Sequence, residues 1–183
     1  MESPARSRVI DAALDLFAEH GVSGTSLQMI ADRIGVTKAA VYHQFPTKDE
    51  IVQAVAAREL AGLEDAIAEA EAQGSAPEAR AVLLAHVVDV AVARRGLTAF
   101  LQTDPIVVRF LAEHEPFQQV TERLYAVLAG PDATPESQIP AAMVTAAIGG
   151  AVNHPLVADL DDETLRAHLL RLAQRLLDVP DDA

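Results

Sequence analysis

"TSLQMIADRIGVTKAAVYHQF", residues 25–45, has the pattern of two short helices separated by a tight turn. Thr25 and Gln28 have the spacing of a capping box, which predicts that the first helix begins at Thr25. An apolar stripe then recurs at helical spacing: Leu27, Ile30, Ala31 and Ile34. Gly35 is expected to end this helix, and Thr37 to cap the next one. Two helices joined by so short a turn form a helix-turn-helix.

The second helix of this pair is expected to have a buried face and an exposed face. Val41 and Phe45 lie one turn apart and predict the face that holds the helix against its neighbours. The opposite face carries Lys38, Ala39, Tyr42 and His43. This is the side of a helix that the major groove of DNA receives in helix-turn-helix proteins.

The rest of the chain predicts an all-α protein. Hydrophobic residues make up 50% of its 183 residues, whereas aromatics are only 4%, and Ala and Leu dominate over short β-branched runs. Residues 4–21 and a long segment from Thr47 through Leu63 read as helices on either side of the helix-turn-helix. We therefore expect a DNA-binding domain over residues 1–48 and a helical bundle over residues 49–183.

Charge divides the chain at the same place. Residues 1–48 hold five basic and five acidic side chains, whereas residues 49–183 hold nine basic and 22 acidic ones, which accounts for the whole net charge of −13. The acidic body should repel DNA everywhere except at the neutral, locally basic head. With no Cys, disulfides and thiolate sites are excluded, which suits a cytoplasmic protein.

No enzyme, cofactor or metal site is predicted. The six His residues include no helical i, i+4 pair, and no nucleophile motif, Gly-rich phosphate loop or convergent carboxylate pair is present. The longest stretch without a charged residue, 137–158, contains only 12 continuous mostly apolar residues, 141–152, too few to span a bilayer.

Residues 8–52 resemble the tetracycline-repressor (TetR) family of bacterial transcriptional regulators, over about a quarter of the chain. The residues that carry the resemblance are Ala13, Phe17, Gly21, Thr25, Ile30, Ala31, Gly35, Val36, Tyr42, Phe45 and Lys48. The resemblance implies a homodimer that binds a palindromic operator through its N-terminal domain. It also implies a C-terminal domain that binds a small, apolar effector, which relieves repression.

The resemblance further implies which residues contact DNA. Phosphates would be contacted by Thr25, Ser26, Tyr42 and Lys48, and bases would be read by Thr37, Lys38, Ala39 and sometimes Gln28. Each of three residues also has an alternative role. Gln28 could serve only in the capping box, and Tyr42 could serve only in packing. His43 could contact a phosphate through water or make no contact with DNA. The Ala39-Ala40 pair departs from the family pattern and offers only methyl contact to thymine.

Two further sets of residues follow from the expected C-terminal domain. A ligand cavity, expected from the resemblance alone, would be lined by His86, Phe100, Asp104, Phe110, His114, Phe117, Tyr125 and Met143. The alternative is that these residues are simply core. The dimer interface is expected at Ala142, Ala146, Gly149, Leu165, Leu169, Leu172 and Leu176, although core packing explains the same spacing. The dimer is favoured because one half-site offers few phosphate contacts.

A second hypothesis, from another functional class, is also open. In it, the chain is a helical ligand-binding or scaffold protein whose N-terminal head docks on a protein partner. Replacing Tyr42 and Lys48 by Ala distinguishes the two, because only a DNA-binding head would lose operator binding with its fold intact.

Overall fold

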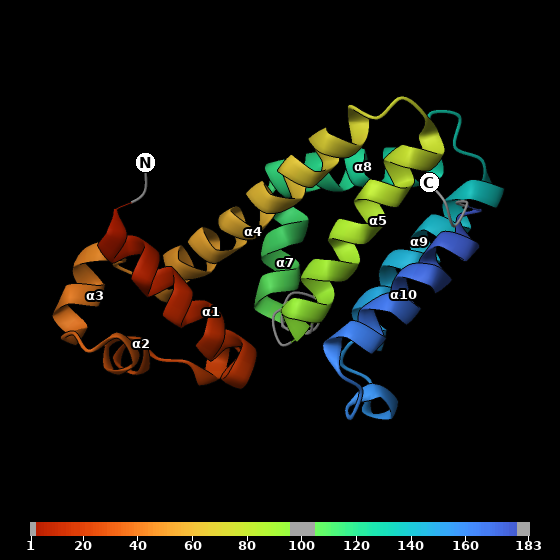
Figure 1. Cartoon of the computed structure of the whole chain (residues 1–183). Helices are drawn as coiled ribbons and strands as arrows, with labels where there is room; N and C mark the ends of the chain where they lie inside the picture. Colours follow the sequence, from red (N-terminus) through yellow and green to blue (C-terminus); the bar gives the residue numbers. More distant parts are fainter. Residues whose placement is uncertain (1–2, 96–104, 179–183) are drawn as a thin grey trace.

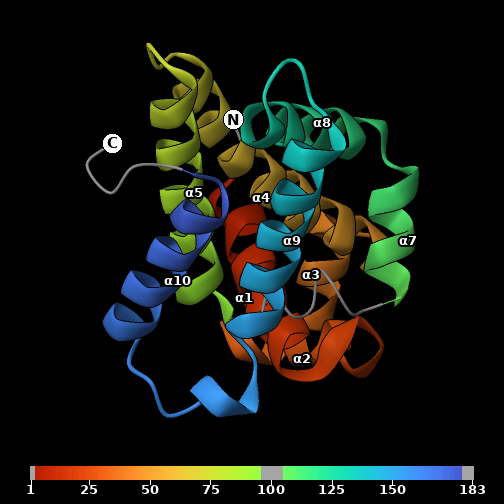
Figure 2. The same cartoon turned by 90° about the vertical axis from the view of Figure 1, so that its right-hand side faces the viewer.

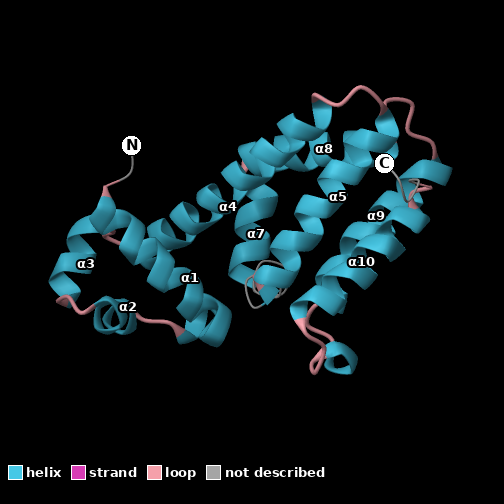
Figure 3. Cartoon of the chain, viewed as in Figure 1, coloured by secondary structure: helices cyan, strands magenta, loops and turns pink. Residues whose placement is uncertain are grey.

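The computed structural model describes residues 3–95 and 105–178, and within these ranges every regular element is a helix (Figures 1 and 3). The elements are α1 Pro4–Gly24, α2 Leu27–Ile34, α3 Lys38–Gln44, α4 Lys48–Glu71, α5 Ala76–Ala93, α7 Pro105–Glu113, α8 Glu115–Ala129, α9 Pro135–Ala151, the 3-10 helix η1 Pro155–Val157, and α10 Asp162–Leu176. The predicted all-α fold is confirmed.

Short polar residues set the boundaries of the N-terminal helices. The side chain of Ser3 accepts a hydrogen bond from the Arg6 amide, and that of Thr37 accepts one from the Ala40 amide, each at 3.2 Å. These bonds satisfy amides that have no partner within the helix. Gly35 ends α2 in the left-handed conformation, with φ of 69°, which glycine adopts without steric cost. The predicted turn and the predicted start of α3 are thus confirmed.

The predicted start of α2 is wrong by one residue. Ser26, not Thr25, is the N-cap, because its hydroxyl accepts the hydrogen bond from the Met29 amide at 3.2 Å. The Thr25 hydroxyl instead points inward and donates to the carbonyls of Leu16, at 3.0 Å, and Gly21, at 2.8 Å. Thr25 therefore joins the second helix to the first.

Two hydrophobic cores share the long helix α4. The head core joins α1, α2 and α3 to Ile51, Val52 and Val55 of α4 and to Val107 of α7. The body core begins at Leu60 of the same helix and continues through α5, α8, α9 and α10. The head core thus extends about two turns past the boundary expected at residue 48. Figure 1 shows α4 running from the head into the body.

In the body, α5 lies at the centre, packed against α4 on one side and α10 on the other, while α8 packs against α4 and α9. Figure 2 shows α9 and α10 side by side on the face of the body that lies away from the head in Figure 1. Within the described ranges, no helix combines the length and hydropathy that crossing a membrane requires.

Candidate nucleic-acid interface and ligand cavity

The short helix α3 has the two faces that its sequence predicts. Val41 and Phe45 are completely buried in the head core. Lys38, Ala39 and His43 are exposed, and 55% of the surface of Tyr42 is open to solvent. Figure 1 shows α3 at the outer end of the head, away from the body. A convex, exposed helix in this position can enter a groove of DNA without a clash from the body.

Three cations of the head lie at the C-terminal ends of its three helices. Arg8 donates to the carbonyl of Ile34, the last residue of α2, at 2.8 Å. Arg6 donates to the carbonyl of Gln44, the last residue of α3, at 3.0 Å. Its guanidinium also lies 3.9 Å from the centre of the Phe45 ring. Helix C-termini carry carbonyls without intrahelical partners and a partial negative charge, so a cation there stabilises the fold.

Lys48 makes the third of these contacts. Its ammonium donates to the carbonyls of Val22, at 2.7 Å, and Thr25, at 3.1 Å, where α1 ends. An ammonium has three N–H groups, so these two bonds use most of its capacity. The phosphate contact predicted for Lys48 stays a prediction, and the structure assigns this side chain a clear internal role.

The two remaining basic residues of the head differ sharply. Arg33 forms an ion pair with Glu19 at 2.9 Å, and the hydrogen bond in this pair holds the pKa of Glu19 below its usual value and raises that of Arg33. Lys38, in contrast, has no hydrogen bond or ion pair to any described residue. The exposed basic residue on the outer face of α3 is therefore Lys38.

The polar residues predicted near α2 have local partners. Gln28 donates to the Asp32 carboxylate at 2.7 Å, one turn further along α2, instead of completing a capping box. Ser26 caps the helix and stays exposed. The Thr25 side chain, 2% exposed, is not presented to solvent, which corrects its expected place on the DNA-facing surface. The sequence missed this because Thr and Ser at adjacent positions both fit an N-cap.

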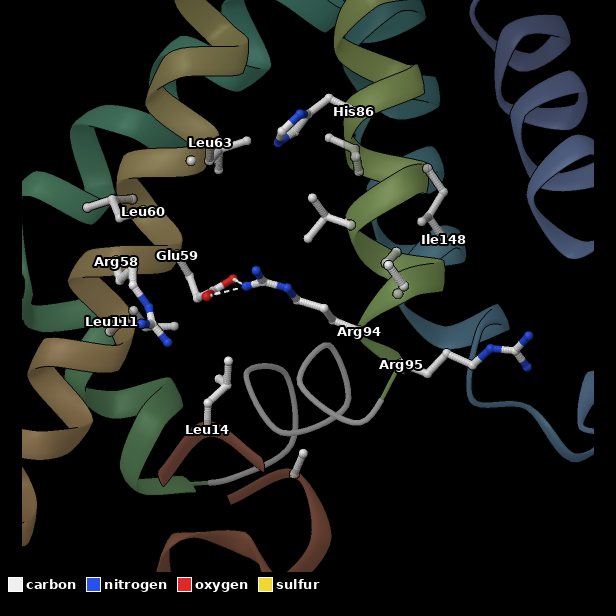
Figure 4. Close-up of a pocket in the computed structure, with 18 of the residues that line it drawn as sticks. Leu14, Arg58, Glu59, Leu60, Leu63, His86, Arg94, Arg95, Leu111 and Ile148 are labelled. Carbon is white, nitrogen blue, oxygen red and sulfur yellow. Dashed lines mark hydrogen bonds and ion pairs between the residues drawn. The ribbon is translucent and has the colours of Figure 1, made fainter. Parts of the chain in front are cut away.

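A cavity of about 950 Å³ lies between the head and the body. Its described walls come from α1, α4, α5, α7, α8 and α9, so the first helix of the head forms part of it (Figure 4). Large apolar side chains in the wall are Leu14, Leu60, Leu63, Leu111, Phe117, Leu124 and Ile148. Polar ones are Asp11, Asp15, Arg58, Glu59, His86, Arg94, Arg95 and Thr145. A mainly apolar cavity with a few polar groups is typical of sites for small molecules.

The structure places two of the residues predicted for this cavity in its wall, His86 and Phe117. The others described are elsewhere: His114 is the N-cap residue of α8, Tyr125 is exposed and lies 3.4 Å from the Thr145 hydroxyl, and Met143 is 55% exposed. Met143 faces outward because Val144 and Ile148 supply the buried side of α9. Phe100, Asp104 and the Phe110 side chain lie outside the described residues.

The ionic residues of the cavity were not predicted. Arg58 pairs with Asp11 of α1 at 2.7 Å, and Glu59 pairs with Arg94 of α5 across the cavity. Neighbouring charged residues on a helix normally indicate a solvated face, and these four come from three separate segments. Only the tertiary arrangement shows that they share one wall.

The outer surface of α9 and α10 exposes several large apolar side chains. Leu172 is 60% exposed and Leu176 41%, and Met143 and Ile139 on α9 are 55% and 59% exposed. Ala142 and Ala146 of the predicted interface are also exposed. Gly149 and Leu165 are instead buried within the body, which corrects their expected place on an interface, whereas Leu169 is half-buried and its place in the interface stays a prediction. Of the leucines of α10, Leu165 therefore faces the core, whereas Leu172 and Leu176 face outward.

Comparison with known proteins finds similarity that is concentrated in the head. Residues 9–55 match the family model described as bacterial regulatory proteins, tetR family. The HTH-type transcriptional regulator SrpR of Pseudomonas putida is 52% identical over 52 residues, which cover 28% of this chain and 24% of that protein. The HTH-type transcriptional repressor AcnR of Corynebacterium diphtheriae is 28% identical over 62% of this chain and 58% of that protein. The chain thus covers less than two thirds of the length of these curated relatives.

Solved structures resemble the whole chain. A transcriptional regulator of the TetR/AcrR family from Thermobifida fusca is 26% identical, with a TM-score of 0.66 and coverage of 96% of this chain and 98% of that one. The structure of AibR in complex with isovaleryl coenzyme A and operator DNA has a TM-score of 0.70 at 15% identity, over 92% of this chain and 97% of that one. At that identity the likeness to AibR shows the fold alone.

Proposed function

Because residues 9–55 match the model of the tetR family of bacterial regulatory proteins, we propose that this chain is a regulator of that kind, which represses transcription by binding a palindromic operator as a homodimer and is released by a small effector. The observation that carries this proposal is the outer face of α3, where Lys38 and Tyr42 are exposed while Val41 and Phe45 hold the helix in place.

On this proposal, α3 enters the major groove of each half-site. Lys38 is the long side chain that can donate to guanine, and Ala39 offers a methyl group to thymine. Tyr42 and Ser26 fix the position of the head on the phosphates, with His43 on the same exposed face. With so few base contacts per half-site, DNA shape contributes to specificity.

The dimer would form through the exposed apolar surface of α9 and α10. Leu172, Leu176 and Met143 would be buried against the same surface of a second copy, as a two-fold interface requires. The two recognition helices would then lie about 34–36 Å apart, one turn of DNA. This arrangement doubles the number of phosphate contacts and hence the electrostatic part of the affinity.

The cavity between head and body supports a response to a ligand. Four residues of α1, a helix of the head core, belong to its wall. A molecule bound there contacts the head directly and can favour one position of the head over another. Its effect on operator binding cannot exceed the difference between its affinities for the two positions. Binding to operator DNA also implies a cytoplasmic protein.

The experiment is selection of bound duplexes from a random pool, followed by titration of the selected operator in a mobility-shift assay. Lys38→Ala and Tyr42→Ala should each weaken binding, at least about tenfold for Lys38 in a dimer that uses it in both half-sites. Arg109→Ala, which removes an exposed cation of α7 outside the helix-turn-helix, is the matched control and should leave affinity unchanged. If no duplex is enriched, or if Lys38→Ala binds as the unmodified protein does, the proposal is wrong.

A further inference from the structure

The charged part of the cavity wall is organised around two neighbouring residues of α4. Arg58 reaches α1, where it pairs with Asp11, and Glu59 reaches α5, where it pairs with Arg94. Figure 4 shows the Glu59–Arg94 ion pair spanning the cavity below Leu63 and His86. A charged ligand that enters this space meets this pair and must compete with one of its two members.

The two members of the pair differ in burial. The Glu59 side chain is 14% exposed, whereas that of Arg94 is 48% exposed. An anionic ligand would take Arg94 and leave the Glu59 carboxylate buried without its partner, which is strongly unfavourable. A cationic ligand would replace Arg94 beside Glu59, and the half-exposed guanidinium can turn further into water. The asymmetry of burial therefore favours a cation.

The other charges in the wall largely compensate one another. Arg95 points away from the cavity in Figure 4, toward Asp162 and the carbonyl of Leu160. Without Arg95, the described wall carries three carboxylates, those of Asp11, Asp15 and Glu59, against the guanidiniums of Arg58 and Arg94. Asp15 also lies close enough to Arg33 to interact with its charge, so the charges of the wall nearly balance and the selection of a cation rests on the burial of Glu59.

We propose that this cavity binds a lipophilic cation, with an apolar body against Leu60, Leu63 and Phe117 and a single positive centre at Glu59 in the place of Arg94. The proposal deepens the ligand response proposed above, since it names the chemical class that the same cavity takes. The apolar walls supply affinity through buried surface, and Glu59 supplies selection by charge.

The test compares tetraphenylphosphonium with tetraphenylborate, two ions of matched shape and opposite charge, by isothermal titration calorimetry on the intact protein. We expect the phosphonium to bind at least about tenfold more tightly than the borate. Glu59→Gln should weaken phosphonium binding about tenfold, and Arg94→Gln should leave it unchanged or strengthen it, because Arg94 is the competitor. Circular dichroism verifies that both variants fold, and the comparison of the two ions on the unmodified protein needs no variant.

Glu71→Gln is the matched control, because it removes the same charge from α4 at an ion pair with Arg123 outside the cavity. It should not change phosphonium affinity. The inference is overturned if the two ions bind equally well, if the borate binds more tightly, or if neither ion binds. It is also overturned if Glu59→Gln and Glu71→Gln change phosphonium affinity equally. Operator binding without any probe tests the proposed function separately. If an operator is selected but the protein prefers the borate, only the cation site is refuted. If the phosphonium binds at Glu59 but no operator is selected, only the proposed regulatory function is refuted.

Discussion

Replacing Lys48 by Met tests whether this cation holds the head together. Met keeps the apolar stem of the side chain but removes the ammonium, which donates to the carbonyls of Val22 and Thr25 at 2.7 and 3.1 Å. Each bond comes from a charged donor in a half-buried place and contributes about 1–1.5 kcal/mol, so the free energy of unfolding should fall by about 2–3 kcal/mol. The measurement is urea unfolding followed by circular dichroism at one fixed protein concentration.

Lys38→Met is the matched control for this experiment. Lys38 is exposed and has no partner in the described part of the chain, so its replacement should change the free energy of unfolding by less than about 0.5 kcal/mol. Equal stability of Lys48→Met and the unmodified protein would refute the idea that Lys48 fixes the end of α1. In that case a drop in the salt dependence of operator binding would restore the phosphate contact as its main role.

Three further predictions concern the core, the dimer and pH. Phe45→Ala removes a completely buried ring and should lower the free energy of unfolding by about 3–5 kcal/mol in calorimetry, with loss of operator binding. Leu172→Glu should convert the dimer to a monomer in sedimentation velocity, and a persistent dimer would exclude the α9–α10 surface. The hydrogen bond from Arg123 lowers the pKa of Glu71 from 4.5, so this pair should stabilise the fold at neutral pH. The difference in urea midpoint between the unmodified protein and Glu71→Gln should therefore shrink as pH falls below 4.5.

The sequence predicted the head in detail because its signals are local. A capping Thr37, a left-handed Gly35 and the spacing of Val41 and Phe45 each act within one helix turn, and all three are confirmed. Thr25 failed because an adjacent Ser competes for the same cap. Its hydroxyl is instead satisfied by two carbonyls of α1, and neither contact has a signature in sequence spacing.

The cavity was harder to predict, because its wall joins six helices from distant parts of the chain. Apolar residues such as Met143 and Phe117 look alike in sequence, yet one is exposed on α9 and the other lines the cavity. The charged pair of Arg58 and Glu59 has the appearance of a solvated helix face. Only the packing of α1 and α5 against α4 gives these residues their partners.

The division of α4 between two hydrophobic cores limits how this protein can be cut and recombined. A fragment that stops at residue 48 would lack Ile51, Val52 and Val55, and even one that continues to Leu60 would lack Val107, which arrives from α7. The head is therefore not an exchangeable module. A chimera that grafts the head onto another body must also bring Val107, which lies more than 60 positions downstream of α3.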